Sequence, residues 1–296
     1  MQGAALDGAI ILWFILTALS LIFIVVDIRN TPEEKVLKWG FILLTAYIGP
    51  FGVFLYVLGC REPLPGLHEK YIASRWRQVL GSTMHCVAGD GLGILAGAAI
   101  GALIHLGPRN DLILEYLLGF GFGWTIFQSL AMKNMLGTYA EALKKTFYAE
   151  FVSMNLLMAG MVPTMMISMR NIAGADDPTG IRFWFVMSYS LLVGFIFAYP
   201  INWWLVSRNL KHGMMTIRKN AQKDSGGHSG HSKPQHQHGQ GKSEDSHSGH
   251  SQKHANNDEH SEHSENQPTT SLSYMLSIAV FSIVVMAIGI YVGFTF

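Results

Sequence analysis

Histidine side chains are concentrated in one polar stretch of the chain. Nine of the 13 histidines lie there, and the pentapeptide His-Ser-Gly-His-Ser occurs twice, at 228–232 and 247–251. The nine are His228, His231, His236, His238, His247, His250, His254, His260 and His263. Imidazole is a common ligand of Zn, Ni, Co and Cu, and the stretch contains no cysteine, so it predicts an exchangeable metal store. The alternatives are a low-complexity spacer and a pH-responsive linker.

A second group of metal-ligand side chains begins an apolar stretch. It consists of Met84, His85, Cys86 and Asp90. Cys86 and Asp90 are four residues apart, so they share one face of a helix. A carboxylate inside a membrane costs roughly 2.5–3.5 kcal/mol on insertion scales, so it normally faces a cavity, a partner or an ion. We expect a metal-handling role for Asp90. The alternative is a carboxyl hydrogen-bonded to Asn155 or Gln128, with Cys86 as a small apolar filler.

Methionines form a stripe further along the chain. Met154, Met158, Met161, Met165 and Met169 are spaced by four, three, four and four residues, which keeps them on one helix face. Thioethers are soft, uncharged ligands that favour Cu(I), so the stripe is a possible metal path. The competing interpretation is an adaptable apolar packing face.

The composition requires membrane helices to hold these residues. The chain has 296 residues, of which 49% are hydrophobic and 14% charged, and apolar stretches of about 20 residues recur. This excludes a soluble enzyme, and the near balance of 21 basic and 20 acidic residues argues against nucleic acid. We expect an all-α membrane protein, a bundle of about seven transmembrane helices with a disordered His-rich cytoplasmic loop. The predicted spans are 8–27, 39–58, 84–106, 112–131, 150–169, 183–206 and 272–294.

The chain divides into four predicted parts. Two N-terminal helices occupy 1–78, a four-helix core 79–219, the disordered loop 220–271 and a last helix 272–296. The first apolar segment lacks the pattern of a cleavable signal peptide, so we expect it to be retained. Gly89, Gly93, Gly97 and Gly101 line one face of a core helix, where small residues favour close helix packing.

Lysine and arginine predict the orientation. With seven spans, and counting the long connection only as far as Lys223, one set of connections holds twelve of these residues and the other set six. The richer side is expected to be cytoplasmic. This places both the N-terminus and the His-rich loop on the cytoplasmic side of the cell membrane. The stretch 138–149 is expected to lie on the cytoplasmic surface as an amphipathic segment, and Glu115 and Glu150 are interpreted as interfacial residues near span ends.

Two longer motifs resemble one prokaryotic family. They are Tyr199-Pro200-Ile201-Asn202-Trp203-Trp204, preceded by the aromatic run 183–187, and His85-Cys86-x-Ala88-Gly89-Asp90. The chain resembles, over about residues 80–215, the multi-pass membrane family called domain of unknown function 4396. The resemblance implies a bacterial or archaeal cytoplasmic-membrane protein in which Asp90, Pro200, Asn202, Trp203 and Trp204 matter. It implies no particular activity.

Two functions are compatible with these patterns. The first is a transporter or exporter of transition metal ions, with Cu(I) favoured over Zn, Ni or Co and the His-rich loop as a metal store. The second is a non-catalytic accessory or assembly subunit of a larger membrane cuproprotein complex. No constellation for an intramembrane enzyme is found. The expected partners are the lipid bilayer and metal ions, with a homo-oligomer or a membrane complex as further possibilities and no nucleic acid.

Overall fold

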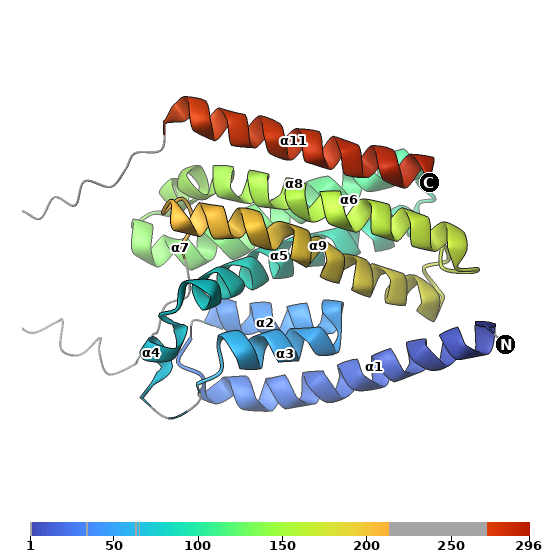
Figure 1. Cartoon of the computed structure of the whole chain (residues 1–296), viewed down its shortest axis with the longest axis horizontal. Helices are drawn as coiled ribbons and strands as arrows, with labels where there is room; N and C mark the ends of the chain where they lie inside the picture. The colour runs from blue at the N-terminus through green and yellow to red at the C-terminus, as the bar shows by residue number, and fades with distance from the viewer. Residues whose placement is uncertain (1, 34, 63, 65, 213–270) are drawn as a thin grey trace, which may run out of the picture. The chain divides into compact units, whose positions relative to one another are not determined.

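A computed structural model describes residues 2–33, 35–62, 64, 66–212 and 271–296, and all regular structure in these ranges is helical (Figure 1). The predicted metal-store histidines lie outside the described residues. The helices are α1 (Gln2–Asp27), α2 (Lys35–Ile48), α3 (Pro50–Gly59), α4 (His68–Ile72), α5 (Arg75–Leu103), α6 (Pro108–Phe122), α7 (Ser129–Leu136), α8 (Tyr139–Asn171), α9 (Ile181–Ser207) and α11 (Leu272–Thr295).

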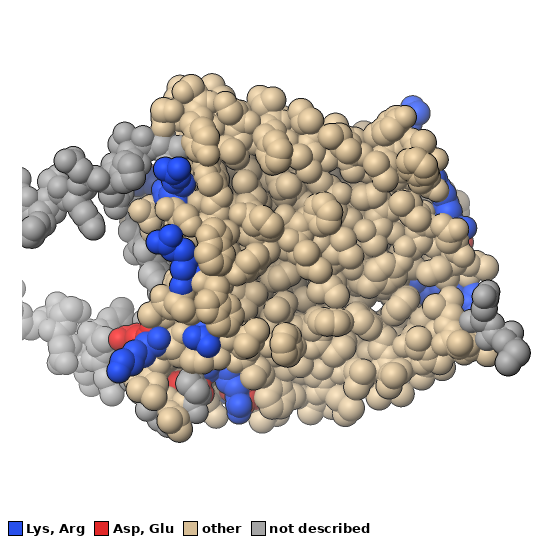
Figure 2. Space-filling view, viewed as in Figure 1, with Lys and Arg blue, Asp and Glu red and all other residues tan. Residues whose placement is uncertain are grey.

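Five helices in the described part of the chain are long and apolar enough to cross a membrane: α1, α5, α8, α9 and α11. On the face shown in Figure 2, charged side chains gather at the two ends of the bundle, and the surface between them carries almost none. Large apolar side chains are exposed along α1 and α11, where lipid rather than protein would cover them. The expectation of an all-α, multi-pass membrane protein is therefore confirmed at this level.

The predicted span 39–58 is instead two shorter helices. They meet at Gly49, whose φ of +66° is a left-handed conformation that favours glycine, and Pro50 begins α3. With 14 and 10 residues, α2 and α3 are about 21 and 15 Å long, short of a hydrocarbon core of about 30 Å. The tip packs against Trp13, near the middle of α1. The segment therefore folds as a helical hairpin whose tip reaches about the middle of α1 and turns back there.

Polar contacts close the base of this hairpin beside the end of α1. The Tyr56 hydroxyl lies 2.7 Å from the Thr31 hydroxyl and donates to Asp27 at 2.9 Å. Arg61, just beyond α3, makes a two-pronged ion pair with the same Asp27 at 2.8 and 2.9 Å. The residues before α2 and after α3 thus lie at the same end of the bundle. Continuous apolar composition on both sides of the turn explains why the sequence pattern resembles a single span.

Side-specific cysteine labelling tests the hairpin. Lys35 and Lys70 are exposed near its base, and Arg109 is exposed at the opposite end of the bundle. A thiol reagent that does not cross membranes should label Lys35→Cys and Lys70→Cys from the same side and Arg109→Cys from the other. Both native cysteines are buried, so the unmodified chain is the blank. Labelling of Lys35→Cys from the Arg109 side would mean that the segment crosses the membrane.

Two helix boundaries differ from the predicted spans in ways that matter for the site. Helix α8 begins at Tyr139, so the stretch 138–149 is its first third and is not a separate surface segment. Thr138 caps this helix by accepting a hydrogen bond from the Glu141 amide. The predicted span 112–131 belongs to a longer helical run, 108–136, in which a π-helical segment, Gly123–Gln128, joins α6 to α7.

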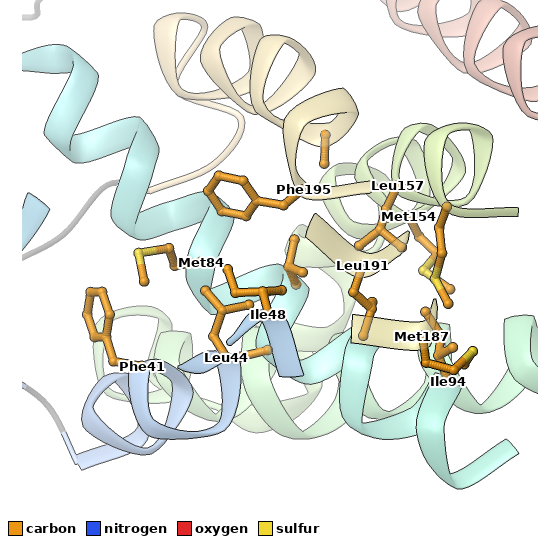
Figure 3. Close-up of a cluster of buried hydrophobic side chains, with 14 of the residues drawn as sticks. Phe41, Leu44, Ile48, Met84, Ile94, Met154, Leu157, Met187, Leu191 and Phe195 are labelled. Carbon is orange, nitrogen blue, oxygen red and sulfur yellow. The ribbon is translucent and has the colours of Figure 1, made fainter. Parts of the chain in front are cut away.

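The core is formed where α5 meets α2, α8 and α9 (Figure 3). Its labelled side chains are Phe41, Leu44, Ile48, Met84, Ile94, Met154, Leu157, Met187, Leu191 and Phe195. The glycine face predicted on α5 packs against the α6 run: Gly93 faces the Leu118 carbonyl and Gly97 the Glu115 backbone. Close backbone approach therefore brings α5, the π-helical segment and α8 together around one polar cluster.

Candidate metal centre

Three ligand-type side chains meet in the interior of the bundle: Cys86 and Asp90 from α5, and Glu150 from α8. All three are fully buried, and their ligand atoms lie within 4.8 Å of one another. The Cys86 Sγ is 3.1 Å from Glu150 Oε2 and 3.5 Å from Asp90 Oδ2. These separations are close to the roughly 3.5 Å between ligand atoms around a tetrahedral zinc ion. We call this cluster the Cys86 centre.

The Cys86 centre lies deep within both of its helices. Asp90 comes fifteen residues after the start of α5, about 22 Å along the axis, and Glu150 eleven residues after the start of α8, about 16 Å along. The interpretation of Glu150 as an interfacial residue is wrong, because it assumed that the helix begins at 150. Glu150 also continues the methionine stripe by one turn towards the N-terminus of α8. That spacing is a signal that sequence reasoning missed.

A buried lysine provides the positive charge at the Cys86 centre. Lys211 follows α9, its ammonium lies 3.9 Å from Glu150 Oε2, and the two side chains are 3% and 0% exposed. Lys211 also donates to the Asn202 side-chain oxygen at 2.8 Å. Since a buried carboxylate is costly without a partner, Lys211 offsets part of the negative charge that Asp90 and Glu150 can carry. Sequence reasoning counted Lys211 only as a cytoplasmic charge.

A serine and an asparagine connect the thiol to this lysine. The Asn202 amide donates to the Ser153 hydroxyl at 2.8 Å and to the Ala198 carbonyl at 2.9 Å. Ser153 in turn lies 3.2 Å from the Cys86 sulfur. Asn202 is therefore held in one orientation, with its side-chain oxygen on Lys211 and its nitrogen towards the centre. These contacts offer a structural reason for the expectation that Asn202 matters.

Two carboxylate oxygens of the Cys86 centre, Asp90 Oδ1 and Glu150 Oε1, accept no hydrogen bond from any other described residue, and the two carboxyl groups are close enough to share a proton with each other. Both lie against Gly123 in the π-helical segment, where a Cβ atom would overlap with each of them. An unpartnered buried oxygen is costly unless another group, such as a cation, binds it. The two oxygens, with the thiol beside them, thus form a site with unused ligand capacity.

Gly123→Ala should therefore disrupt the Cys86 centre. The added methyl group would push the Asp90 and Glu150 oxygens apart, so we expect a large loss of metal binding with smaller effects on protein level. Gly121→Ala is the matched control, because a Cβ there meets nothing within 4 Å. Metal bound per purified protein measures the effect. Equal binding by the two variants would contradict the assigned position of Gly123.

Cavities lie on both sides of the Cys86 centre. A cavity of about 260 Å³ is lined by Gln128, Met132, Lys145, Thr146, Ala149, Asn209, Leu210, Lys211 and His212, at the α7 end of the bundle. A larger one, about 600 Å³, lies at the opposite end and includes Met165, Met169, Asp111, Glu115 and His105 in its lining. Lys211 thus borders the first cavity and pairs with Glu150. Met154, Met158 and Met161 occupy α8 between Glu150 and the second cavity.

Among the described residues, the other predicted ligands are not part of the Cys86 centre. Met84 lies in the apolar core among residues of α2 and α9, and the His85 ring packs on Phe127 with centroids 5.6 Å apart. Met154, Met158 and Met161 are buried among apolar side chains. Of the predicted ligands within the described ranges, the Cys86 centre contains Cys86 and Asp90, and the structure adds Glu150 and Lys211.

A comparison with family models gives one match, and curated proteins and solved structures give none. Residues 75–211 match the family described as Domain of unknown function (DUF4396). The matched range begins at the first residue of α5 and ends at Lys211, so it contains every residue of the Cys86 centre and its hydrogen-bonded neighbours. The N-terminal hairpin and α11 lie outside it. Residues 75–211 therefore form a domain of the domain of unknown function 4396 family.

Proposed function

We propose that this protein moves a transition metal cation across the cell membrane through the Cys86 centre. One observation carries the proposal: two fully buried carboxylates each leave an oxygen that no described residue outside the pair hydrogen-bonds, beside a thiol at ligand distance. Ionisable groups inside a membrane are costly and typically mark an ion pathway. Cavities at both ends of the bundle are consistent with a path to and from this site.

The ligand set favours a borderline divalent ion. Cu(I) prefers thiolates and thioethers, whereas Zn(II), Co(II) and Ni(II) also accept carboxylates. Cys86 with Asp90 and Glu150 therefore suits a divalent ion better than Cu(I). The prediction of copper rests on the methionine stripe, and its buried members on α8 serve equally well as apolar packing. We propose Zn(II) or a chemically similar ion as the primary substrate.

Lys211 supplies a mechanism for cation exchange. A metal ion that enters the Cys86 centre brings positive charge to the same carboxylates that Lys211 now offsets. Because two cations close together repel each other, the ion and the lysine ammonium compete for Glu150. An incoming ion would displace Lys211 from Glu150, and return of the lysine would favour release. The exchange keeps the buried charge compensated throughout.

The hairpin changes the proposed orientation. Arg29, Lys35 and Lys38 now lie at the same end as Arg61 and the other basic connections, so twelve described lysines and arginines stand at this end and three at the other. The α6 run, 108–136, is as long as α5 and provides a sixth crossing beside the five long helices. By the positive-inside rule the lysine-rich end is cytoplasmic and the N-terminus outside, the reverse of the seven-span prediction. Lys211 then lies at the cytoplasmic side.

Elemental analysis of cells tests the proposal and identifies the ion. Cells that express the protein should differ from control cells in their content of one metal when Zn, Co, Ni and Cu are supplied in excess. We expect the largest change for zinc, cobalt or nickel. If no metal content changes and the protein co-purifies with a membrane cuproprotein, the accessory-subunit function replaces the transporter.

A further inference from the structure

A second cluster of ligand-type side chains lies outside the matched family range. Glu33 is in the connection between α1 and α2, Cys60 directly follows α3, and His68 is the first residue of α4. All three side chains are buried: those of His68 and Glu33 are 0% and 1% exposed, and Cys60 is 0% exposed. Three separate segments therefore converge at the base of the hairpin.

The geometry of this cluster suits a tetrahedral metal ion. The His68 Nε2 atom lies 3.5 Å from Glu33 Oε1, and the Cys60 sulfur lies 3.8 Å from the same oxygen. Each residue offers one ligand atom within 4.8 Å of the other two. From bond lengths of about 2.1 Å for nitrogen or oxygen and 2.3 Å for sulfur, a tetrahedral zinc ion separates N from O by about 3.4 Å and S from O by about 3.6 Å. Small adjustments of the side chains would bring the ligand atoms to the separations expected around a zinc ion.

We propose that Glu33, Cys60 and His68 supply three ligands of a second metal site, which binds Zn(II) at the base of the hairpin. Thiolate, imidazole and carboxylate together are typical zinc ligands. An ion there would connect the α1–α2 linker, the end of α3 and the start of α4. Contacts near the same base, such as the hydrogen bond from Tyr71 to the Leu58 carbonyl at 2.9 Å, already fix α4 against α3. The site does not depend on the proposed transport.

The alternative is a cluster held by hydrogen bonds alone. His68 Nε2 lies 3.0 Å from the Cys60 carbonyl oxygen and can donate to it. Metal binding requires this nitrogen to turn from the carbonyl to the ion, a movement of the imidazole ring within the same buried space. The two accounts differ in one observable property, because only the metal site forms a metal–sulfur bond at Cys60.

Cobalt(II) substitution separates the two accounts in the full-length protein. The chain contains two cysteines, Cys60 and Cys86, so any thiolate-to-cobalt charge-transfer absorption must come from one of them. Histidines elsewhere in the chain do not contribute to this band. We expect Cys86→Ser protein to retain a saturable band from one cobalt ion per chain, and the double variant with Cys60→Ser to have none. Zinc added afterwards should remove the band by displacing cobalt.

Conservative variants identify the remaining ligands. In the Cys86→Ser background, Glu33→Gln keeps the size of the side chain and His68→Gln keeps an amide donor near the position of Nε2, and each should weaken cobalt binding at least tenfold. Glu69→Gln, on the exposed surface of α4, is the matched control. Monodisperse elution in detergent confirms folding. If folded Cys86→Ser protein shows no band at saturating cobalt, the second site is wrong. A band that survives in Cys86→Ser but is absent from Cys60→Ser would instead contradict the Cys86 centre.

Discussion

Asp90→Asn is expected to abolish the effect of this protein on cellular metal content. The amide keeps the shape of the side chain but removes its negative charge and weakens its oxygen as a metal ligand. Loss of a group that only supports a metal ligand typically lowers metal affinity or activity by roughly 10- to 100-fold. Loss of a ligand itself should therefore reduce metal handling by more than this. The amide also inserts into the membrane at least as easily as the carboxylate. Metal content per cell, divided by protein level, measures the change.

Glu141→Gln is the control for the loss of a carboxylate. Glu141 lies on the exposed first turn of α8 and makes an ion pair with Lys145, both more than half exposed. Exposed pairs of this kind contribute little to stability. This variant should behave like the unmodified protein. Unchanged metal content with Asp90→Asn, at equal protein level, would mean that Asp90 only packs against its neighbours.

Lys211→Gln is expected to destabilise the metal-free protein and to strengthen metal binding. Removing one partner of a buried ion pair costs about 3–5 kcal/mol, because the remaining charge is uncompensated. A divalent ion can replace the lost charge without competing with the ammonium, so its affinity should rise by about tenfold or more, which equals about 1.4 kcal/mol. Thermal unfolding of the purified protein, with and without Zn(II), measures both effects. The stabilisation by zinc should be larger than in the unmodified protein.

A compensating variant separates charge from packing at this position. Lys211→Gln combined with Glu150→Gln removes both members of the buried pair, so most of the lost stability should return. Metal binding should fall in the double variant, because a ligand is gone. If the double variant is no more stable than Lys211→Gln alone, the lysine contributes by packing and not by charge compensation.

The polar face of α5 could be predicted from the sequence, whereas its partners could not. Helical periodicity places Cys86 and Asp90 on one face, and a carboxylate among apolar residues is conspicuous. Glu150 was misplaced because the predicted span began at that residue, although its spacing from Met154 continues the methionine stripe. Lys211 is distant in sequence, and only the packing of α9 on α5 and α8 brings it to the centre. Such long-range contacts leave no local pattern.

The hairpin shows where hydropathy alone fails. Residues 39–58 are apolar enough and long enough for a span, and a window of that length does not register a reversal in direction. The Gly49-Pro50 pair was the available signal, because glycine permits a positive φ and proline begins a helix readily. Missing it changed the side expected for the N-terminus and for the connection between α1 and α2, relative to the orientation proposed from the structure. The Glu33, Cys60 and His68 cluster was missed for the same reason, since it exists only when the chain turns back.

Metal entry into vesicles that contain only this protein tests the central claim most directly. Purified protein is reconstituted into liposomes loaded with a zinc-sensitive dye. Zn(II) is added outside, and the initial rate of the fluorescence change is measured. The account predicts a rate well above that of protein-free vesicles for the unmodified protein, and a rate equal to theirs for Asp90→Asn. Equal rates for the unmodified protein and Asp90→Asn, whether fast or absent, would contradict transport through the Cys86 centre.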